Sequence, residues 1–442
     1  MQGQRRVRLK NEYLNMANRI KKVTIEKLWG VKNISTELYD DVNIFIGVNG
    51  SNKTTFLSLI EAAVLVDIPT LGSIDFEKIN LSIDSEIVRS INITKNYDLD
   101  YPIVHYSLDD TDSFDIPCTD AINRPYRMGS KYRESFIDLR KKINTALSIS
   151  WISVNRWDSM QGDYDRSERM ERYKSLVDAK TQELTRQLVM YQLQLDSEAN
   201  KISNKFKEDV LSLMLYNEEF DSYSQKTLAR FSDVDTVLMQ KDLFRAFSAL
   251  GLAQDKSASI KNHVQRIKDV VEGIKQTQRV NIDDVFVLSL ISRTFSIIDI
   301  SKNHETQTKE IYAPIENFKK YLKGFMPDKD FDVIKDNDGG IEVSLYGKDK
   351  ENKIPIGING LSSGEKQLFI LLSEALLQRE KPYIFIADEP ELSLHISWQQ
   401  KILGELLRLN PNAQIIVATH SPEIAGNFPK RVINMQNIVE YV

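Results

Sequence analysis

The chain has 442 residues, enough for roughly two to four domains of ordinary size. Its net charge of −5, from 58 basic and 63 acidic side chains, excludes a uniformly basic nucleic-acid coat but permits a local basic groove. The single cysteine, Cys118, excludes an internal disulfide and a cysteine-rich zinc site, and is typical of the cytoplasm. No apolar run approaches the roughly 20 residues that a membrane-spanning helix needs, so we expect no membrane segment.

The first part of the chain predicts an α/β lobe. Ile20–Leu28 alternates apolar and polar residues like a half-buried strand, and Asn43–Ile46 is a short apolar strand that leads into a glycine. Phe56–Val66 has the apolar spacing of a buried helix, and short strands are expected between residues 80 and 115. We place the boundaries of this lobe at 16–155.

The middle of the chain predicts helices. Residues 164–302 lack proline, and apolar residues recur at three-, four- and seven-residue steps over 184–210. This spacing predicts an amphipathic helix, compatible with a coiled coil, for which 257–277 could supply an antiparallel partner. A projecting arm and a compact helical subdomain are both consistent with this pattern. We assign 156–310 to a helical insertion.

Strands and turns return in the last part, 311–442. Two apolar segments, 331–334 and 341–346, flank the turn sequence Asp-Asn-Asp-Gly-Gly and predict a hairpin. The segments that follow alternate strand, helix and strand, at Tyr383–Ala387, Ser397–Leu409 and Gln414–Ala418. The sequence therefore predicts an α/β fold with antiparallel β elements and a helical insertion.

A glycine-rich turn, GVNGSNKTT at 47–55, follows one strand and opens a helix, which is the place of a phosphate-binding loop. Lys53 would reach the β and γ phosphates, and the Thr54 hydroxyl would hold Mg²⁺. Asn52 stands where this loop usually has its second glycine. Because asparagine tolerates left-handed backbone well, we expect the loop shape to persist with a side chain crowding the phosphates, although a chance turn is the alternative. The candidate nucleotide-binding residues are Asn49, Gly50, Ser51, Asn52, Lys53, Thr54 and Thr55.

Two later strands end in polar residues. The strand Tyr383–Ala387 is followed by Asp388, a candidate Mg²⁺ ligand, and by Glu389, a candidate base for an attacking water. His420 follows the next strand and can donate a hydrogen bond to a γ-phosphate oxygen. An ordinary acidic turn and a structural histidine are the alternatives for these segments.

A third candidate is the segment LSSGEKQ, which precedes an apolar helix. Ser363 and Gly364 are expected at the helix N-terminus, where free N–H groups and the helix dipole favour an anion. Ser362 and Glu365 have the spacing of a capping box, and the two interpretations are compatible.

In their order, these segments resemble the ATP-binding-cassette ATPases, in the branch that holds the chromosome-maintenance (SMC), double-strand-break-repair and RecF proteins. LSSGE resembles the signature motif, IADEPELSLH the Walker B motif with its following loop, and ATHSP the switch histidine. The resemblance implies an ABC-type P-loop fold, ATP and Mg²⁺ as cofactors, and a homo-oligomer in which Ser363 and Gly364 act on the partner's ATP. It also suggests Gln161 as a Mg²⁺ ligand, with Asn155–Trp157 as another candidate for that region.

Within this branch the chain is most similar to ATPases of bacterial anti-phage defence systems related to the OLD nucleases. The two-component PARIS system fits best and Septu second. The histidines are scattered and the chain ends soon after His420. The resemblance therefore implies a cytoplasmic, slow ATPase whose nuclease effector, of Toprim or OLD type, is encoded nearby, acts in trans and responds to a phage protein trigger.

Two other functions stay open. The first is a RecF- or SMC-like repair ATPase that binds duplex DNA through a basic groove. The acidic residues that lie between the candidate basic residues indicate an ordinary solvated helix face instead of such a groove. The second is a non-hydrolysing, ATP-bound scaffold, suggested by Asn52. The basic residues that would bind DNA are Arg166, Arg169, Arg172, Lys174 and Lys180.

Overall fold

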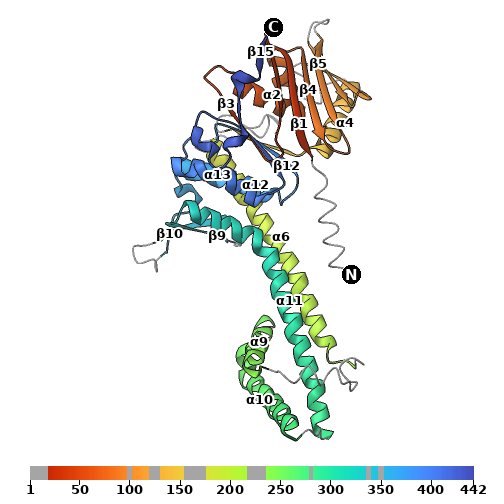
Figure 1. The fold of residues 1–442 in the computed structure, drawn as a ribbon, viewed down its shortest axis with the longest axis vertical. Coiled ribbons are helices and arrows are strands. Elements are labelled where there is room, and N and C mark those ends of the chain that lie inside the picture. Colours follow the sequence, from red (N-terminus) through yellow and green to blue (C-terminus); the bar gives the residue numbers. More distant parts are fainter. Residues whose placement is uncertain are drawn as a thin grey trace. The chain divides into compact units, whose positions relative to one another are not determined.

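The computed structural model describes residues 18–96, 102–118, 130–153, 176–216, 235–277, 282–334, 340–346 and 353–442 (Figure 1). The chain divides into two compact units. One comprises Met1–Met190 together with Asn317–Val442, and the other is Tyr191–Glu316. None of the helices in the described ranges has an apolar stretch long enough to cross a membrane.

The first unit contains a seven-stranded antiparallel sheet in the order β15-β2-β1-β4-β5-β6-β7. Every second residue of β4 is buried, as expected for a sheet with one face on a core. That face packs with helix α2 in one continuous apolar core. The strands are β1 (Arg19–Leu28), β2 (Lys32–Glu37), β4 (Lys78–Asp84), β5 (Ser90–Asn96), β6 (Ile103–Leu108), β7 (Asp112–Pro117) and β15 (Val439–Tyr441).

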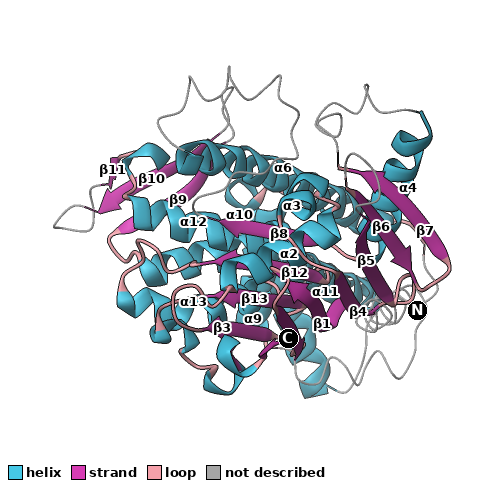
Figure 2. Cartoon of the chain, turned by 90° about the horizontal axis from the view of Figure 1, so that it is seen from above, coloured by secondary structure: helices cyan, strands magenta, loops and turns pink. Residues whose placement is uncertain are grey.

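A second sheet in this unit has five parallel strands in the order β14-β3-β13-β12-β8 (Figure 2). Every residue of β13 is buried, which is typical of parallel sheets covered on both faces. Helix α2 packs on three of these strands, and α12 packs on α13. The strands are β3 (Val42–Ile46), β8 (Ile149–Ser153), β12 (Tyr383–Asp388), β13 (Ala413–Ala418) and β14 (Val432–Asn434), and the helices are α2 (Lys53–Leu65), α3 (Ile68–Ser73), α4 (Ser130–Ala146), α12 (Ser363–Leu377) and α13 (Ile396–Leu409).

The expected hairpin is confirmed. Strands β9 (Lys329–Ile334) and β10 (Gly340–Tyr346) pair antiparallel, with Val333 opposite Ile341, and β11 (Lys353–Pro355) adds a third strand. The turn residues 335–339 lie outside the described ranges. Together with the two larger sheets, this hairpin confirms the α/β fold with antiparallel elements.

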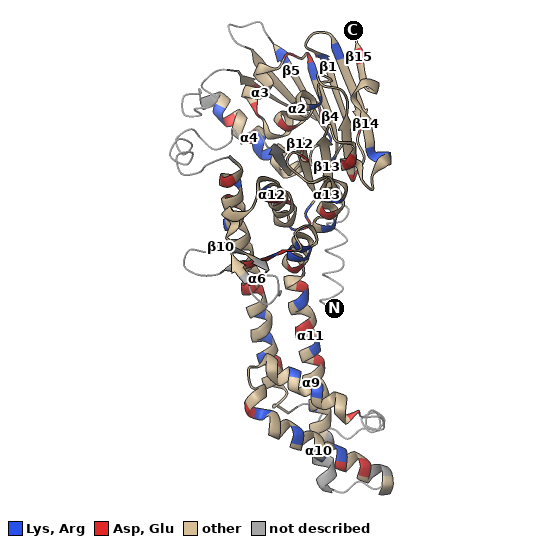
Figure 3. Ribbon diagram, turned by 90° about the vertical axis from the view of Figure 1, so that its left-hand side faces the viewer, with Lys and Arg blue, Asp and Glu red and all other residues tan. Residues whose placement is uncertain are grey.

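The second unit is helical and has its own core. Helices α9 (Thr236–Ala249) and α10 (Ala253–Thr277) pack their apolar residues on α11 (Ile282–Phe325). The partner of α6 (Leu176–Ser212) is α11, because Tyr312 donates a hydrogen bond to Asp196 at 2.8 Å and Phe206 stacks on His304. The expectation that 257–277 pairs with α6 is therefore wrong. Basic and acidic residues are interspersed along these helices, as a solvated face requires (Figure 3).

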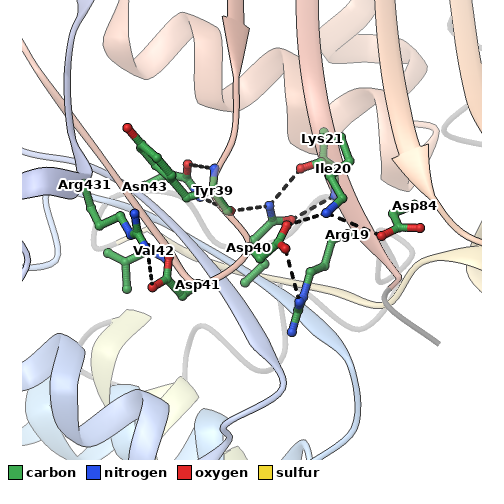
Figure 4. A network of polar contacts seen from close by, with 11 residues as sticks. Arg19, Ile20, Lys21, Tyr39, Asp40, Asp41, Val42, Asn43, Asp84 and Arg431 are labelled. Atoms are coloured by element: carbon green, nitrogen blue, oxygen red, sulfur yellow. Dashed lines mark hydrogen bonds and ion pairs between the residues drawn. The ribbon is translucent and has the colours of Figure 1, made fainter. Parts of the chain in front are cut away.

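The two larger sheets of the first unit are joined by a polar network (Figure 4). The buried Gln414 side chain, on β13, bonds the backbone N–H and C=O of Ile20, on β1. Asn43, on β3, bonds the backbone of Tyr39 at 2.7 and 2.9 Å. An open pocket of about 430 Å³ lies beside this junction, and ion pairs engage its charged residues Arg19, Lys21, Asp40, Asp41 and Arg431.

Candidate functional site

Three loops meet at the carboxyl edge of the parallel sheet. Strand β13 lies between β3 and β12, and Ala418 is level with Phe45 on one side and with Asp388 on the other. The backbone continues these contacts beyond the strands. The Thr419 N–H donates to the Phe45 carbonyl at 3.0 Å, and the Glu389 N–H donates to the Ala418 carbonyl at 2.8 Å. The loops after β3, β12 and β13 therefore start side by side, which is where open α/β sheets bind their ligands.

The loop between β3 and α2 has the backbone of a phosphate-binding loop. Asn52, the residue before the helix, has φ 68° and ψ 22°, so it adopts the left-handed conformation expected of the glycine it replaces. Gly50 has φ 80° and is exposed. At Gly47 a β-carbon would lie 2.6 Å from Ser51 Oγ, so a side chain there would require Ser51 to move.

The Lys53 side chain is folded into this loop. It is 5% exposed, and its Nζ donates to the Gly47 carbonyl at 2.9 Å. Burial lowers the pKa of this amine, while the charges of Glu389, Asp388 and Glu391 act in the opposite direction. Since phosphate oxygens are stronger acceptors than a carbonyl, a nucleotide in the loop would replace this contact.

Asn52 makes a contact that the sequence did not suggest. Its Oδ1 accepts a hydrogen bond from Lys32 Nζ, on β2, at 2.8 Å. The same amine lies 5.6 Å from the centre of the Tyr441 ring, on β15. The Asn52 side chain is thus tied to the antiparallel sheet.

The acidic end of β12 faces the loop after β13. Glu389 has φ 50°, a conformation that costs a non-glycine residue about 1–2 kcal/mol and is maintained here by the backbone bond to Ala418. Its Oε1 lies 3.8 Å from His420 Nε2, and both side chains are more than a third accessible to solvent. A carboxylate and an imidazole therefore share an open edge beside Lys53, which is the arrangement that phosphoryl chemistry needs.

Magnesium fits this edge through oxygen ligands. Thr54 is exposed in the first turn of α2, and Asp388 ends β12. Within the described ranges, no group of three His, Cys, Asp or Glu side chains could hold a metal by itself. A Mg²⁺ ion here would be completed by water and phosphate oxygens, as is usual for this ion. The other predicted ligand, Gln161, and the alternative Asn155–Trp157 lie outside the described ranges.

The segment LSSGE is at the start of α12, as expected. Ser362 and Glu365 form both bonds of a capping box. Ser363 is exposed, whereas Gly364 is buried against the loop after β12, where a β-carbon would lie 2.2 Å from the Ser393 carbonyl oxygen. The structure thus places Ser363 and Gly364 beside the loop that follows Glu389.

Ion pairs hold α12 in place. Burial works to raise the pKa of Glu365, but hydrogen bonds from Lys329 and Ser362 outweigh it and lower that pKa. Lys180, one of the basic residues considered for DNA binding, is engaged with an acidic residue of α12, and the other four lie outside the described ranges. The pairs are Lys329–Glu365, Lys366–Asp178 and Lys180–Glu374, each at 2.7 Å.

Sequence reasoning missed two residues of this edge, Lys32 and Glu391. Lys32 reaches the phosphate loop from β2, and Glu391 is a buried carboxylate beside His420. The only signal for Glu391 was a third acidic residue in IADEPELSLH, after Asp388 and Glu389.

Comparison with known proteins assigns these motifs to a family. Residues 19–425 match the family model described as AAA ATPase domain. The Retron Vc95 probable ATPase of Vibrio cholerae serotype O1 biovar El Tor is 25% identical over 262 residues, which are 52% of this chain and 46% of that protein. The Retron Ec83 probable ATPase of Escherichia coli is 31% identical over 99 residues, 20% of this chain and 17% of that one. The chain thus spans less than half the length of these curated relatives.

Solved structures show a more distant likeness. The Smc head domain with an extended coiled coil bound to the C-terminal domain of ScpA, derived from Pyrococcus furiosus, has 15% identity and a TM-score of 0.39, covering 96% of this chain and 95% of that one. The Smc head domain with a coiled coil and joint from Pyrococcus yayanosii has 14% identity and a TM-score of 0.41, covering 96% of each chain.

Proposed function

The chain belongs to the AAA ATPase domain family, and on this premise we propose that it binds ATP with Mg²⁺ and hydrolyses the γ-phosphate at the carboxyl edge of its parallel sheet. One observation carries the proposal. Lys53, Asp388 and His420 come from three distant segments, yet adjacent strands deliver them to one edge. Elements far apart in sequence supply a cation, a carboxylate and an imidazole to the same place, as phosphoryl transfer requires.

Each residue has a part that follows from its chemistry. The N–H groups of 49–55 surround the phosphates, and Lys53 Nζ leaves the Gly47 carbonyl for the β and γ phosphate oxygens. Thr54 and Asp388 would hold Mg²⁺, which when bound neutralises phosphate charge. Glu389 orients the attacking water and accepts its proton, and His420 donates a hydrogen bond to a γ-phosphate oxygen.

Nucleotide binding by the Lys53→Ala variant tests this proposal. Loss of the buried amine removes the main cation of the loop, so we expect affinity for Mg-ATP to fall by about tenfold to a hundredfold. Lys401→Ala, which removes an exposed lysine of α13, should bind like the wild type. Wild-type protein that binds no ATP at millimolar nucleotide with Mg²⁺ would overturn the proposal.

At the level of biology, we propose that this ATPase is the nucleotide-controlled subunit of an anti-phage defence complex. Support comes from the similarity to the two retron probable ATPases and from the resemblance to defence ATPases of the PARIS and Septu type. In this proposal, ATP closes pairs of chains, and the assembly holds a nuclease effector that a phage protein releases. A trigger can act only if it binds one state of the assembly better than the other.

The defence proposal is tested in cells that carry the chain with its neighbouring genes. Phage plating should be reduced by the wild-type chain, and Lys53→Ala should restore plating whereas Lys401→Ala should not. Co-purification should recover a nuclease encoded beside this chain. Protection that persists with Lys53→Ala would exclude nucleotide control.

A non-hydrolysing scaffold is a second candidate, and the contact between Lys32 and Asn52 favours it. This hydrogen bond ties the phosphate loop to β2, so it can restrain the loop after ATP has bound. In a scaffold, Mg-ATP binds with the affinity of an ATPase but no phosphate is released. Measuring phosphate release beside binding separates the two functions.

A further inference from the structure

One buried carboxylate holds the loop that carries His420. Glu391 Oε1 accepts hydrogen bonds from the Thr419 hydroxyl, from the His420 N–H at 3.0 Å and from the Ser421 N–H at 3.2 Å. The Glu391 side chain is only 8% exposed, and Thr419 is fully buried. These three donors, one hydroxyl and two backbone N–H groups, converge on one oxygen and so fix the side chain of Thr419 and the backbone of His420 and Ser421.

A second contact holds the same loop from the side of α13. Ser421 Oγ donates to Gln399 Oε1 at 2.7 Å, and Gln399 Nε2 donates to the Leu394 carbonyl at 3.0 Å. Leu394 follows Ser393, whose carbonyl oxygen lies against Gly364. The loop of His420 is thus connected through α13 to the loop on which the first turn of α12 packs.

The imidazole has a weak polar anchor. It is 41% exposed, and the polar partner that the described residues give its ring is Glu389, at 3.8 Å. Its position therefore depends on the backbone that carries it. Hydrogen bonds to an ionised acceptor are about twice as strong as neutral ones, and a misplacement of about 1 Å in a catalytic group costs on the order of a hundredfold in rate.

We propose that Glu391 is a positioning residue for His420, which sets the imidazole relative to Glu389 and the γ-phosphate by clamping residues 419–421. This inference rests on the proposed function. Glu391 acts through His420 and does not touch the nucleotide. Because its charge also raises the pKa of Lys53, the test must separate turnover from nucleotide binding.

A double-mutant cycle on the full chain makes this separation. We expect Glu391→Ala to lower kcat by at least about tenfold while the Kd for Mg-ATP changes less than about threefold. In a His420→Ala background the same substitution should change kcat by less than about twofold, because residues that act as one unit are not additive. Equal losses in the two backgrounds, or a loss of binding in place of turnover, would overturn the proposal.

Three variants serve as controls. Glu391→Gln keeps an oxygen that accepts the same donors and should retain most of the turnover. Glu423→Ala removes a carboxylate of the same region whose partner is Gln400, at 2.6 Å, and should behave like the wild type. If Glu391→Ala does not fold, Thr419→Val removes one of the three donors and should give an intermediate loss of kcat.

Ring signals of labelled histidine, observed by NMR in the full chain, test the clamp without turnover. The chain has five histidines, and the His420 signal is assigned by its absence in His420→Ala. Glu391→Ala should shift or broaden this signal alone, and Glu423→Ala should leave it in place. An unchanged His420 signal would contradict the clamp. If the wild type binds ATP without hydrolysing it, the hydrolysis proposal fails while this measurement still decides the role of Glu391.

Discussion

At the scale of single residues, the conformation of the phosphate loop depends on Asn52. A left-handed backbone at this position is easy for glycine and costs other residues about 1 kcal/mol or more, with asparagine among the most tolerant. The side chain that asparagine brings is bonded to Lys32 and restrains the loop from β2. The departure from the usual glycine is therefore a structural link and not only a tolerated substitution.

Asn52→Gly tests the effect of this link. We expect the variant to keep the loop conformation and to hydrolyse ATP about fivefold faster, since the hydrogen bond it removes is worth about 1 kcal/mol. Lys32→Met removes the same bond from the other side and should give a similar gain, with no further gain in the double variant. Phosphate release under saturating Mg-ATP measures this, and slower turnover of Asn52→Gly would show that the link is required instead.

The conformation and contacts of single residues could be predicted from the sequence where they depend on neighbouring residues in the chain. The left-handed backbone of Asn52 followed from its place in the loop, and the capping box of Ser362 and Glu365 from their spacing. Lys32 and Glu391 could not be found in this way. Each of them contacts a residue on a different strand or loop that is distant in the sequence. A local sequence pattern does not predict which loops come into contact.

At the scale of elements, the first turn of α12 is fitted to the loop after β12 by Gly364. A β-carbon there would lie 2.2 Å from a backbone oxygen, so a side chain can enter only if the helix or the loop moves. Close packing leaves little room for such movement, and overpacking of this kind costs about 1–3 kcal/mol.

Gly364→Ala should therefore lower the stability of the protein by about 1–3 kcal/mol, measured as a lower midpoint in thermal unfolding. Gly404→Ala is the matched control, because Gly404 lies inside α13 and a β-carbon added there would have no neighbouring atom within 4 Å. It should raise stability by about 0.5–1 kcal/mol, the usual gain of alanine over glycine within a helix. Equal midpoints for the two variants would contradict the tight fit at Gly364.

Most elements followed from periodicity, but their partners did not. The alternation of Ile20–Leu28 and the apolar run at β13 predicted strands that the structure contains. The pairing of α6 with α11 was missed, because an amphipathic face shows that a partner exists and not which helix supplies it. The separation of the strands into a large antiparallel sheet, a parallel sheet and a small antiparallel sheet likewise depends on contacts between distant segments.

At the scale of the whole molecule, Ser363 and Gly364 begin α12, beside the loop that follows β12. In the proposed function, a second copy brings its own α12 to the bound nucleotide. The number of chains in the oligomer and the identity of the effector could not be predicted from the sequence. Both depend on surface contacts with other molecules, and such contacts produce no periodic pattern in the sequence of this chain.

Glu389→Gln should make the pairing measurable. Without the carboxylate that accepts the proton of water, ATP stays bound, and we expect Mg-ATP to convert the variant from monomer to dimer in analytical ultracentrifugation. Adding Ser363→Arg should abolish the dimer, and adding Lys53→Ala should abolish it through loss of the nucleotide. A Glu389→Gln variant that remains monomeric with ATP bound would argue against nucleotide-dependent pairing.

The joining of the two sheets has a consequence for how this protein is made. Ile20 is bonded to Gln414, 394 positions later, and β2 and β3 take their last partners from β15 and β14. At about 5–20 residues per second, the ribosome needs roughly 20 to 80 seconds to supply those strands. Meanwhile the nascent chain carries open strand edges, which invite aggregation. Both larger sheets therefore stay incomplete until the end of the chain has been made, whereas the helical unit can complete its own core earlier.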